Sequence, residues 1–213
     1  MNLIIIDLVS NIKIGGAIMR IGIDIDGVLT DIEQWQIDCG SKYFNKEVVN
    51  PEGYEISEIF EVSDELDSKF WKEYLHDYVT KEPSRKYASE VIQKLKNEGN
   101  EIYIVTARYL TDKDTDEGKQ MREIVFNWLK EQKIYYDKVV FSPEDKLKTC
   151  LDNNIDIMIE DKVENINNVS TKIPVICFNA GYNKICSGKN IYRAYSWYDI
   201  YNLISGGKIC KKK

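Results

Sequence analysis

Apolar residues along the chain follow two different spacings. Short β-branched or apolar runs, typical of buried strands, lie at 21–25, 102–105, 139–141, 155–159 and 173–178. Between these runs, apolar residues recur every three or four positions, which predicts amphipathic helices over 88–95, 121–129 and 197–204. Five strands that alternate with helices predict an α/β fold with a central parallel sheet and right-handed crossovers.

The segment between the first two expected strands breaks this alternation. Residues 31–83 are acidic and aromatic, show no convincing strand pattern, and contain helical spacing such as Leu66, Phe70 and Tyr74. We therefore expect 31–83 to be a small helical cap inserted into a core formed by 19–30 and 84–213. A helical insert directly after a strand-end loop is suited to cover a site there, to exclude water and to hold a ligand.

The first 18 residues are treated separately. Gly15 and Gly16 shortly precede Met19, and paired glycine codons can spell a purine-rich ribosome-binding site. We expect residues 1–18 to be a non-native extension, with Met19 as the true start. The alternative is an additional edge strand.

Polar residues follow four of the expected strands at the point where each strand ends. In parallel sheets the carboxyl ends of the strands meet at one edge, which is where ligands bind. The first pair precedes a turn at Gly27, and the lysine lies in a helix expected to begin at Ser142 with Pro143 at its first position. The residues at this edge are Asp24 and Asp26, Thr106, Lys146, and the adjacent Glu160 and Asp161.

The chemistry of Asp24 and Asp26 follows from their spacing. Period-two alternation points both carboxylates the same way, and like charges that close repel. A divalent cation with oxygen ligands relieves this, and Mg²⁺ is the common choice beside phosphates. One carboxylate can then attack phosphorus while the other handles the leaving-group proton. Taken alone, the pair is also compatible with a strand end that carries two solvated acids.

Each of the other candidates also has a purely structural interpretation. Thr106 suits a strand end, Lys146 a solvated surface, and Glu160-Asp161 a helix N-cap. Arg108 can contact phosphate or the cap, or only pair with an acid. Trp35 follows the catalytic loop closely enough to contact a substrate. The occurrence of all the polar positions together, in order, favours an enzyme.

The stretch Asp24-Ile-Asp26-Gly-Val-Leu-Thr30 resembles the first motif of the haloacid dehalogenase (HAD) superfamily of phosphotransferases. The threonine, the lysine and the acidic pair downstream appear in the order of its three further motifs. The resemblance runs from Ile21 to about Asn183. It implies a three-layer, Rossmann-like HAD core with a central parallel sheet and a small inserted helical cap.

The resemblance also implies a role for each residue. Asp24 would be the nucleophile that forms an aspartyl-phosphate, and Asp26 the general acid and then the base that activates water. Thr106 and Lys146 would hold the transferring phosphoryl group. Mg²⁺ would be bound by Asp24, by Asp161 and by the backbone carbonyl of Asp26, with Glu160 close by. The cofactor expected is therefore Mg²⁺.

Within the superfamily the chain is most similar to the deoxyribonucleotidase-type 5′-nucleotidases, in its opening motif, its cap and its size. This implies a phosphomonoester hydrolase acting on (deoxy)nucleoside monophosphates. Two positions differ: Ile32 stands where such relatives carry an aromatic residue, and Ala107-Arg108 where they often carry Ser-Pro. The alternatives are a sugar- or other small-metabolite phosphatase of the same superfamily, or a binding module without turnover.

Composition limits the partners. Among 213 residues, 30% are charged and the net charge is −6, which argues against a nucleic-acid polymer as partner and favours a small phosphorylated metabolite. No apolar run approaches the length of a membrane span. Five cysteines without CxxC spacing suggest free thiols in a reducing compartment, so we expect a cytoplasmic protein. The oligomeric state stays open.

Overall fold

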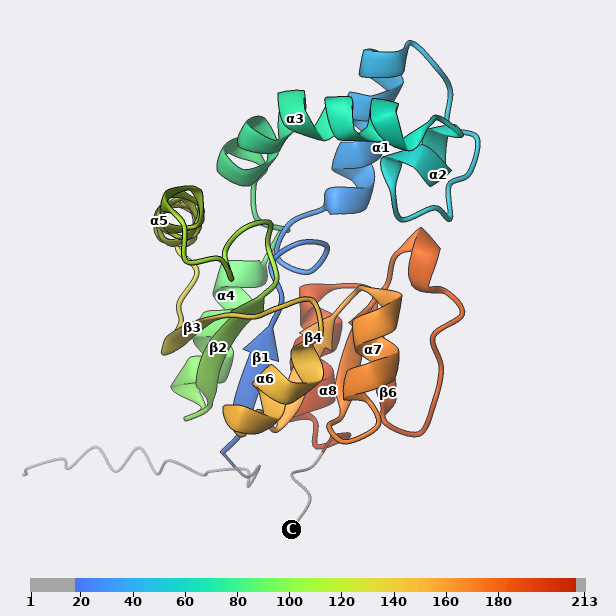
Figure 1. Ribbon diagram of the computed structural model, residues 1–213. Coiled ribbons are helices and arrows are strands. Elements are labelled where there is room, and N and C mark those ends of the chain that lie inside the picture. The colour runs from blue at the N-terminus through green and yellow to red at the C-terminus, as the bar shows by residue number, and fades with distance from the viewer. Residues whose placement is uncertain (1–17, 210–213) are drawn as a thin grey trace, which may run out of the picture.

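A six-stranded parallel sheet forms the centre of the computed structural model, which describes residues 18–209 (Figure 1). The strand order is β3-β2-β1-β4-β5-β6. The strands are β1 (Arg20–Ile23), β2 (Glu101–Thr106), β3 (Lys138–Phe141), β4 (Ile157–Glu160), β5 (Val175–Phe178) and β6 (Ile191–Ala194). The parallel sheet with flanking helices confirms the α/β fold expected from the sequence.

The helices belong to two groups, which differ in their place relative to the sheet. Those that flank the sheet are α4 (Ala88–Asn97), α5 (Asp116–Glu131), α6 (Lys146–Asp152), α7 (Val163–Val169) and α8 (Trp197–Ser205). The segment 31–83, called the helical insert below, contributes α1 (Ile32–Phe44), α2 (Ile56–Phe60) and α3 (Asp64–Lys81). These three lie together beyond one edge of the sheet (Figure 1). A short 3₁₀ helix, η1 (Gly181–Asn183), follows β5.

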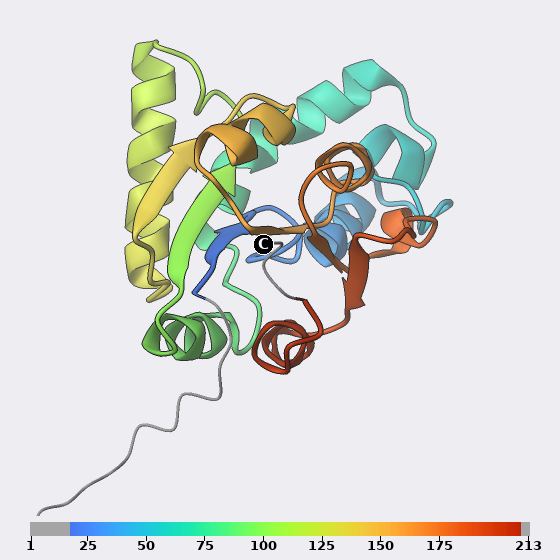
Figure 2. The same cartoon turned by 90° about the horizontal axis from the view of Figure 1, so that it is seen from below.

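Strand alternation divides the core between the two faces of the sheet. Ile21, Ile104 and Ile159 pack in one apolar cluster with residues of α4, α5 and α8. Val105 and Met158 point the other way and pack with residues of α6 and α7. Figure 2 shows these helices on either side of the strands. The two faces give the three layers that the resemblance implies.

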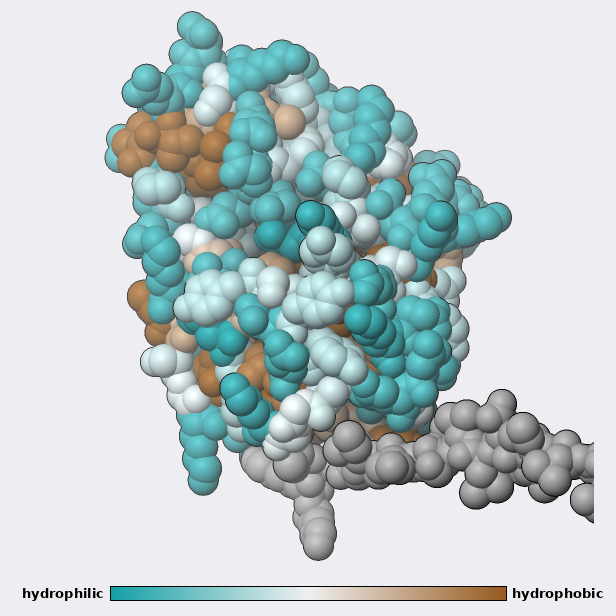
Figure 3. Space-filling view, turned by 180° about the vertical axis from the view of Figure 1, so that it is seen from behind, coloured by the Kyte–Doolittle hydropathy of each residue, from teal (hydrophilic) through white to brown (hydrophobic). Residues whose placement is uncertain are grey.

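The insert has its own apolar interior, built largely from aromatic rings. Ile56, Ile59, Phe60 and Phe70 are buried there, and Trp35 packs against them. Gly40 lies where an added Cβ would be 2.2 Å from the Phe60 ring, so α1 and α2 meet closely at this point. Seen from behind, the surface of the molecule is mainly hydrophilic, with an apolar area over the insert (Figure 3).

Two expectations about the elements are wrong. The sequence predicts 173–178 as the last strand, but β6 follows it and pairs with β5. This edge strand is missed because three of its four residues are half-buried, so its sequence shows neither an apolar run nor alternation. Helix α6 begins at Lys146, not at Ser142, because the Asp145 side chain accepts from the Leu147 amide and caps it there.

Other expectations concern single segments. The proposed extension 1–18 lies outside the described residues except for Ile18. Cys150, Cys177 and Cys186 are buried free thiols and Cys39 is a half-buried one, whereas Cys210 is not described. Within residues 18–209, no helix combines the length and apolarity that crossing a membrane requires.

Candidate active site

The predicted polar residues meet at the carboxyl edge of the sheet, beneath the helical insert. Asp24 directly follows β1, Thr106 ends β2, and Glu160 ends β4 with Asp161 next to it. Lys146 opens α6, the helix that follows β3. Parallel pairing aligns these strand ends, with Ile23 opposite both Ile104 and Ile159. The structure therefore brings together residues that lie up to 137 positions apart, since Asp24 and Asp161 are both on this edge.

Lys146 is the central cation of the site. Its Nζ lies 2.7 Å from Asp24 Oδ2 and 2.8 Å from Glu160 Oε2. The second Glu160 oxygen accepts from the backbone amides of Asp161 and Lys162, each at 3.0 Å. Lys146 is 2% exposed and Glu160 is fully buried. Glu160 thus holds both Lys146 and the start of the loop that carries Asp161.

Asp24, Glu160 and Asp161 form a buried acidic group. One oxygen from each lies within 4.8 Å of the others, an arrangement that could hold a metal ion. Tyr182 donates a hydrogen bond to Asp161 Oδ2, whereas Asp161 Oδ1 is buried without a partner among the described residues. Carboxylate oxygens are the preferred ligands of hard divalent cations. The donor set therefore fits such an ion.

Gly27 permits the close approach that completes this group. Its φ is +81°, a conformation that favours glycine, and an added Cβ would lie 1.9 Å from Asp161 Oδ2. The backbone of the first loop is thus pressed against the Asp161 carboxylate.

Burial and the proximity of charged neighbours shift the pKa values of Asp24, Asp161 and Lys146. Burial raises the pKa of Asp24 to about 8, with Lys146 opposing and Glu160 and Asp26 adding to the increase. Burial, followed by the charges of Glu160 and Asp24, raises the pKa of Asp161 well above its usual range. Although burial opposes it, the two adjacent carboxylates raise the pKa of Lys146, which stays charged. The group has more negative charge than Lys146 can balance.

Asp26 has a separate set of partners. Arg108 Nη2 lies 2.5 Å from Asp26 Oδ1, and Arg108 Nε is 3.1 and 3.2 Å from the two carboxylate oxygens. Tyr78, from α3 of the insert, donates to Asp26 Oδ1 at 2.8 Å. Burial opposes ionisation, but Arg108 and then Tyr78 lower the pKa of Asp26. Arg108 and Tyr78 therefore favour the ionised form of Asp26 in this arrangement.

Thr106 and Arg108 are linked through the backbone. Thr106 is fully buried, and its Oγ1 accepts from the Arg108 amide at 3.1 Å. Arg108 is 4% exposed, and its Nη1 is buried without a partner among the described residues. The side chain that sequence reasoning left between three roles thus pairs with an acid and still has an unused donor.

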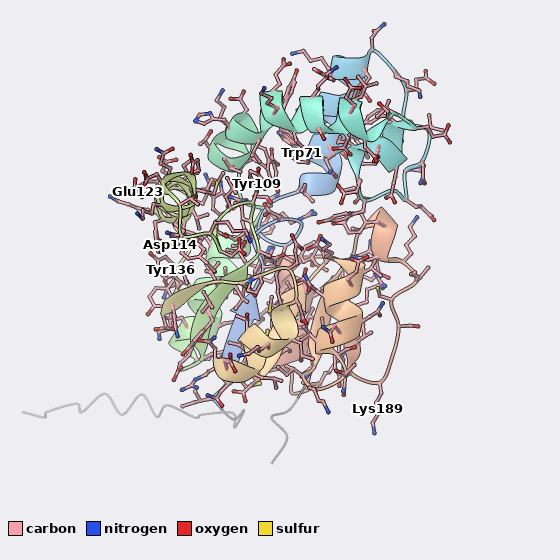
Figure 4. The ribbon with its side chains drawn as sticks, in the orientation of Figure 1. Trp71, Tyr109, Asp114, Glu123, Tyr136 and Lys189 are labelled. Atoms are coloured by element: carbon pink, nitrogen blue, oxygen red, sulfur yellow. The ribbon has the colours of Figure 1, made fainter. Side chains whose placement is uncertain are left out.

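A cavity of about 730 Å³ opens beside Asp26, between the insert and the loop after β2. Its polar lining consists of Asp26, Asp67, Ser68, Lys72, Tyr78 and Arg108. Ile32, Leu75 and Val79 are apolar parts of its wall, and Trp71 and Tyr109 are the aromatic ones. Figure 4 labels Trp71 on the insert and Tyr109 below it on the core.

Trp35 is the predicted substrate contact that the structure does not bring to this cavity. Its ring stacks on Trp71 at 5.6 Å between centroids and also contacts Phe70 and Tyr74. Trp35 therefore supports Trp71 from behind, and Trp71 faces the cavity in its place. Trp71, Leu75 and Tyr78 follow helical spacing on one face of α3, which is the only sequence signal that could have selected them.

Comparisons with known proteins agree with this geometry. Residues 17–211 match the family described as 5′ nucleotidase, deoxy (Pyrimidine), cytosolic type C protein. The chain belongs to this nucleotidase family. A nucleotidase of Clostridium acetobutylicum is 28% identical over 190 residues, which are 87% of this chain and 93% of that protein.

The fold of this nucleotidase-family member recurs in solved structures. A HAD-superfamily hydrolase from Geobacter sulfurreducens aligns with a TM-score of 0.56 at 15% identity, covering 89% of this chain and 98% of that chain. The expected fold is thus shared with HAD-superfamily hydrolases, and the family match confirms the expected enzyme class, a phosphatase of the nucleotidase type.

Proposed function

We propose that this HAD phosphatase is a Mg²⁺-dependent 5′-nucleotidase that hydrolyses (deoxy)nucleoside monophosphates through an aspartyl-phosphate on Asp24. The observation that carries the proposal is the cavity beside Asp26, whose aromatic and apolar walls suit a nucleoside. The family description, which names deoxy and pyrimidine nucleotides, supports the same substrate class.

The position of Asp26 indicates where the leaving group lies. An acid that protonates the leaving oxygen must be within hydrogen-bond reach of it. Asp26 lines the cavity, so the nucleoside extends into the cavity while the phosphate lies towards Asp24. A volume of about 730 Å³ is within the range of small-molecule sites.

One part of the cavity wall favours a planar, partly apolar group over a sugar, while Asp67, Ser68 and Lys72 line another part. Ile32, Leu75 and Val79 offer no hydrogen bonds, and a polyhydroxylated leaving group would lose its water contacts against them. Trp71 and Tyr109 offer ring faces on which a base can stack. Trp71 would then stack on the base, which is the role expected of the aromatic residue that relatives carry at the position of Ile32.

The reaction proceeds in two steps on the core residues. An ionised Asp24 oxygen forms a bond to phosphorus as the ester oxygen leaves, and Asp26, protonated from solvent or by the preceding turnover, gives that oxygen its proton. Water then attacks the aspartyl-phosphate, Asp26 takes the proton from water, and Asp24 and inorganic phosphate are released. Lys146 and the Thr106 hydroxyl stabilise the phosphoryl oxygens in both steps. Arg108 Nη1 provides a further donor for phosphate.

Mg²⁺ would be held by Asp24 and Asp161, with the Asp26 backbone carbonyl as a further ligand and Glu160 adding charge from behind. Bound there, it would supply positive charge to the phosphoryl oxygens and offset the acidic group. The unpartnered Asp161 Oδ1 supports this assignment. The helical insert would act as the cap that covers the nucleoside and keeps bulk water from the intermediate.

A phosphate-release panel tests the proposal. Deoxynucleoside and ribonucleoside monophosphates, sugar phosphates and p-nitrophenyl phosphate would be compared with Mg²⁺ and with EDTA. The expected result is that nucleoside monophosphates have the highest kcat/KM, that EDTA abolishes activity, and that Asp24→Asn is inactive. Asp152→Asn, an exposed aspartate on α6, is the matched control and should keep full activity.

A second variant tests the nucleoside site itself. Trp71→Leu should raise KM for nucleoside monophosphates at least about fivefold, the loss expected for one base–aromatic stack, with little change for p-nitrophenyl phosphate. Tyr198→Leu removes a half-exposed ring on α8 and should change neither value. Sugar phosphates as the leading substrates, with an unaffected Trp71→Leu, would refute the nucleotidase assignment and favour the sugar-phosphatase alternative.

A further inference from the structure

Among the described residues 31–83 of the helical insert, Tyr78 is the one whose side chain hydrogen-bonds to Asp26. Its hydroxyl lies 2.8 Å from Asp26 Oδ1 and 2.8 Å from Thr30 Oγ1, while the residue as a whole is 2% exposed. Thr30 is fully buried in the loop that carries Asp26. A residue 52 positions away in sequence thus contacts the catalytic loop at two points.

Hydrogen-bond chemistry fixes the direction of these contacts. Tyr78 and Arg108 both donate to Asp26 Oδ1, which can accept with the acid proton absent or on Oδ2, so the single hydroxyl proton of Tyr78 goes to Asp26. Tyr78 then accepts from Thr30, whose one hydroxyl proton is shared between the Tyr78 oxygen at 2.8 Å and the Ile25 carbonyl at 3.2 Å. The Tyr78 oxygen is therefore hydrogen-bonded both to Thr30 of the core and to Asp26.

The ring of Tyr78 is fixed by packing against two tryptophans and an arginine. Its centroid lies 4.8 Å from that of Trp35 and 5.9 Å from that of Trp71. The Arg108 guanidinium lies 5.5 Å from the ring and also binds Asp26. Tyr78 and Arg108 together leave the Asp26 carboxyl group little freedom to rotate.

We propose that Tyr78 is a positioning residue of the phosphatase reaction, which from the insert orients the Asp26 carboxyl group towards the leaving oxygen. This rests on the proposed role of Asp26, and it extends that role to a residue outside the four motifs. The position of the insert thereby affects proton transfer as well as substrate binding.

The consequence is a dependence on the leaving group. An alkoxide, such as the ribose oxygen of a nucleotide, needs a proton as it leaves, and general acid catalysis contributes about 10²–10⁴-fold to such steps. Nitrophenolate is stable as an anion and leaves without a proton. Misdirecting Asp26 should therefore lower kcat/KM, which reports on the steps up to departure of the leaving group, for alkyl phosphates and spare it for p-nitrophenyl phosphate.

Tyr78→Phe tests this, since it keeps the ring and removes only the hydroxyl. For the best alkyl phosphate of the panel, kcat/KM should fall about tenfold, whereas for p-nitrophenyl phosphate it should fall less than about twofold. Tyr74→Phe is the matched control, one turn earlier on α3. The Tyr74 ring stacks on Phe70, and among the described residues its hydroxyl makes no hydrogen bond to Asp26. It should match wild type on both substrates. Melting temperatures of the variants report on folding.

The outcomes separate the two proposals. An equal loss of kcat/KM on both substrates would show that Tyr78 supports only the structure of the site, and an unchanged kcat/KM for the alkyl phosphate would show that it does not position Asp26. Either result overturns the inference while the nucleotidase assignment stands. If sugar phosphates lead the panel, the nucleotide assignment fails, and Tyr78→Phe is judged on the sugar phosphate. If wild type hydrolyses no alkyl phosphate, the inference falls with the proposed function.

Discussion

Replacing Lys146 by methionine would remove the cation that Asp24 and Glu160 share. Methionine is similar in length and apolar, so the main change is electrostatic. Both carboxylates are buried, and both lie within 2.8 Å of the lysine nitrogen. The variant therefore leaves two acids without their nearest positive charge in a site from which water is largely excluded.

The size of the effect follows from the burial of the pair. Removing one partner of a buried ion pair costs about 3–5 kcal/mol of unfolding free energy. For a domain of this length, each kcal/mol shifts the melting temperature by about 2–4 °C, so we expect a decrease of about 6–20 °C. The deficit should grow as the pH rises, because the unpaired acids bind protons in the folded state at low pH and lose them at high pH.

Thermal unfolding in EDTA at several pH values measures this, because a bound divalent ion would offset the missing charge. Lys148→Met is the matched control: it removes an exposed lysine two positions along α6, which pairs with Asp152, and it should leave the melting temperature nearly unchanged. Equal effects of the two variants, or a deficit at Lys146 that does not depend on pH, would refute the reasoning. Activity of Lys146→Met should fall at least about a hundredfold.

Two further predictions concern the acidic group. In EDTA the unfolding free energy should fall as the pH rises from about 4 to about 8, because the pKa of Asp24 is about 8 when folded and its ordinary value is 3.8. For this one carboxyl group, the unfolding free energy measured by urea titration should fall by about 1.4 kcal/mol per pH unit. Mg²⁺ should reduce this slope. An unfolding free energy that rises with pH in EDTA would contradict the raised pKa of Asp24. Gly27→Ala should weaken Mg²⁺ binding, followed by calorimetry, and lower kcat at least about tenfold, since its Cβ would displace the Asp161 carboxylate. Gly207→Ala is the control, because Gly207 also has a positive φ of +69° but its added Cβ would meet no atom within 4 Å, so only stability should fall. Equal effects of the two variants on activity would exclude a specific role for Gly27.

The strand ends could be predicted from the sequence because two simple rules locate them. Apolar runs identify buried strands, and parallel pairing places their carboxyl ends at one edge, so Asp24, Thr106, Lys146 and Asp161 were expected together. The geometry brings them there, whereas their chemical roles stay predictions. Glu160 is an example of what the rules leave open, because its two oxygens are used by Lys146 and by backbone amides.

The contribution of the insert could not be predicted in the same way. The side of a helix that faces a cavity depends on how the helix docks, and the spacing of α3 suits two faces. One face carries Phe70 and Tyr74 towards α1, and the other carries Trp71 and Tyr78 towards the cavity. The sequence therefore suggested Trp35, which is nearest to the catalytic loop in the chain but is covered by Trp71.

The place of β1 in the sheet has a consequence for how the chain is made. This first strand lies between β2 and β4, so Ile21 pairs with both Ile102 and Ile157. Such distant pairings close late and slow folding, because the entropy of long loops must be lost before the contacts form. During synthesis, the edge of β1 that pairs with β4 has no partner strand until β4 has emerged from the ribosome. A chain that stops before β4 would present that edge to other chains, so premature termination should yield an aggregating fragment and not a smaller folded domain.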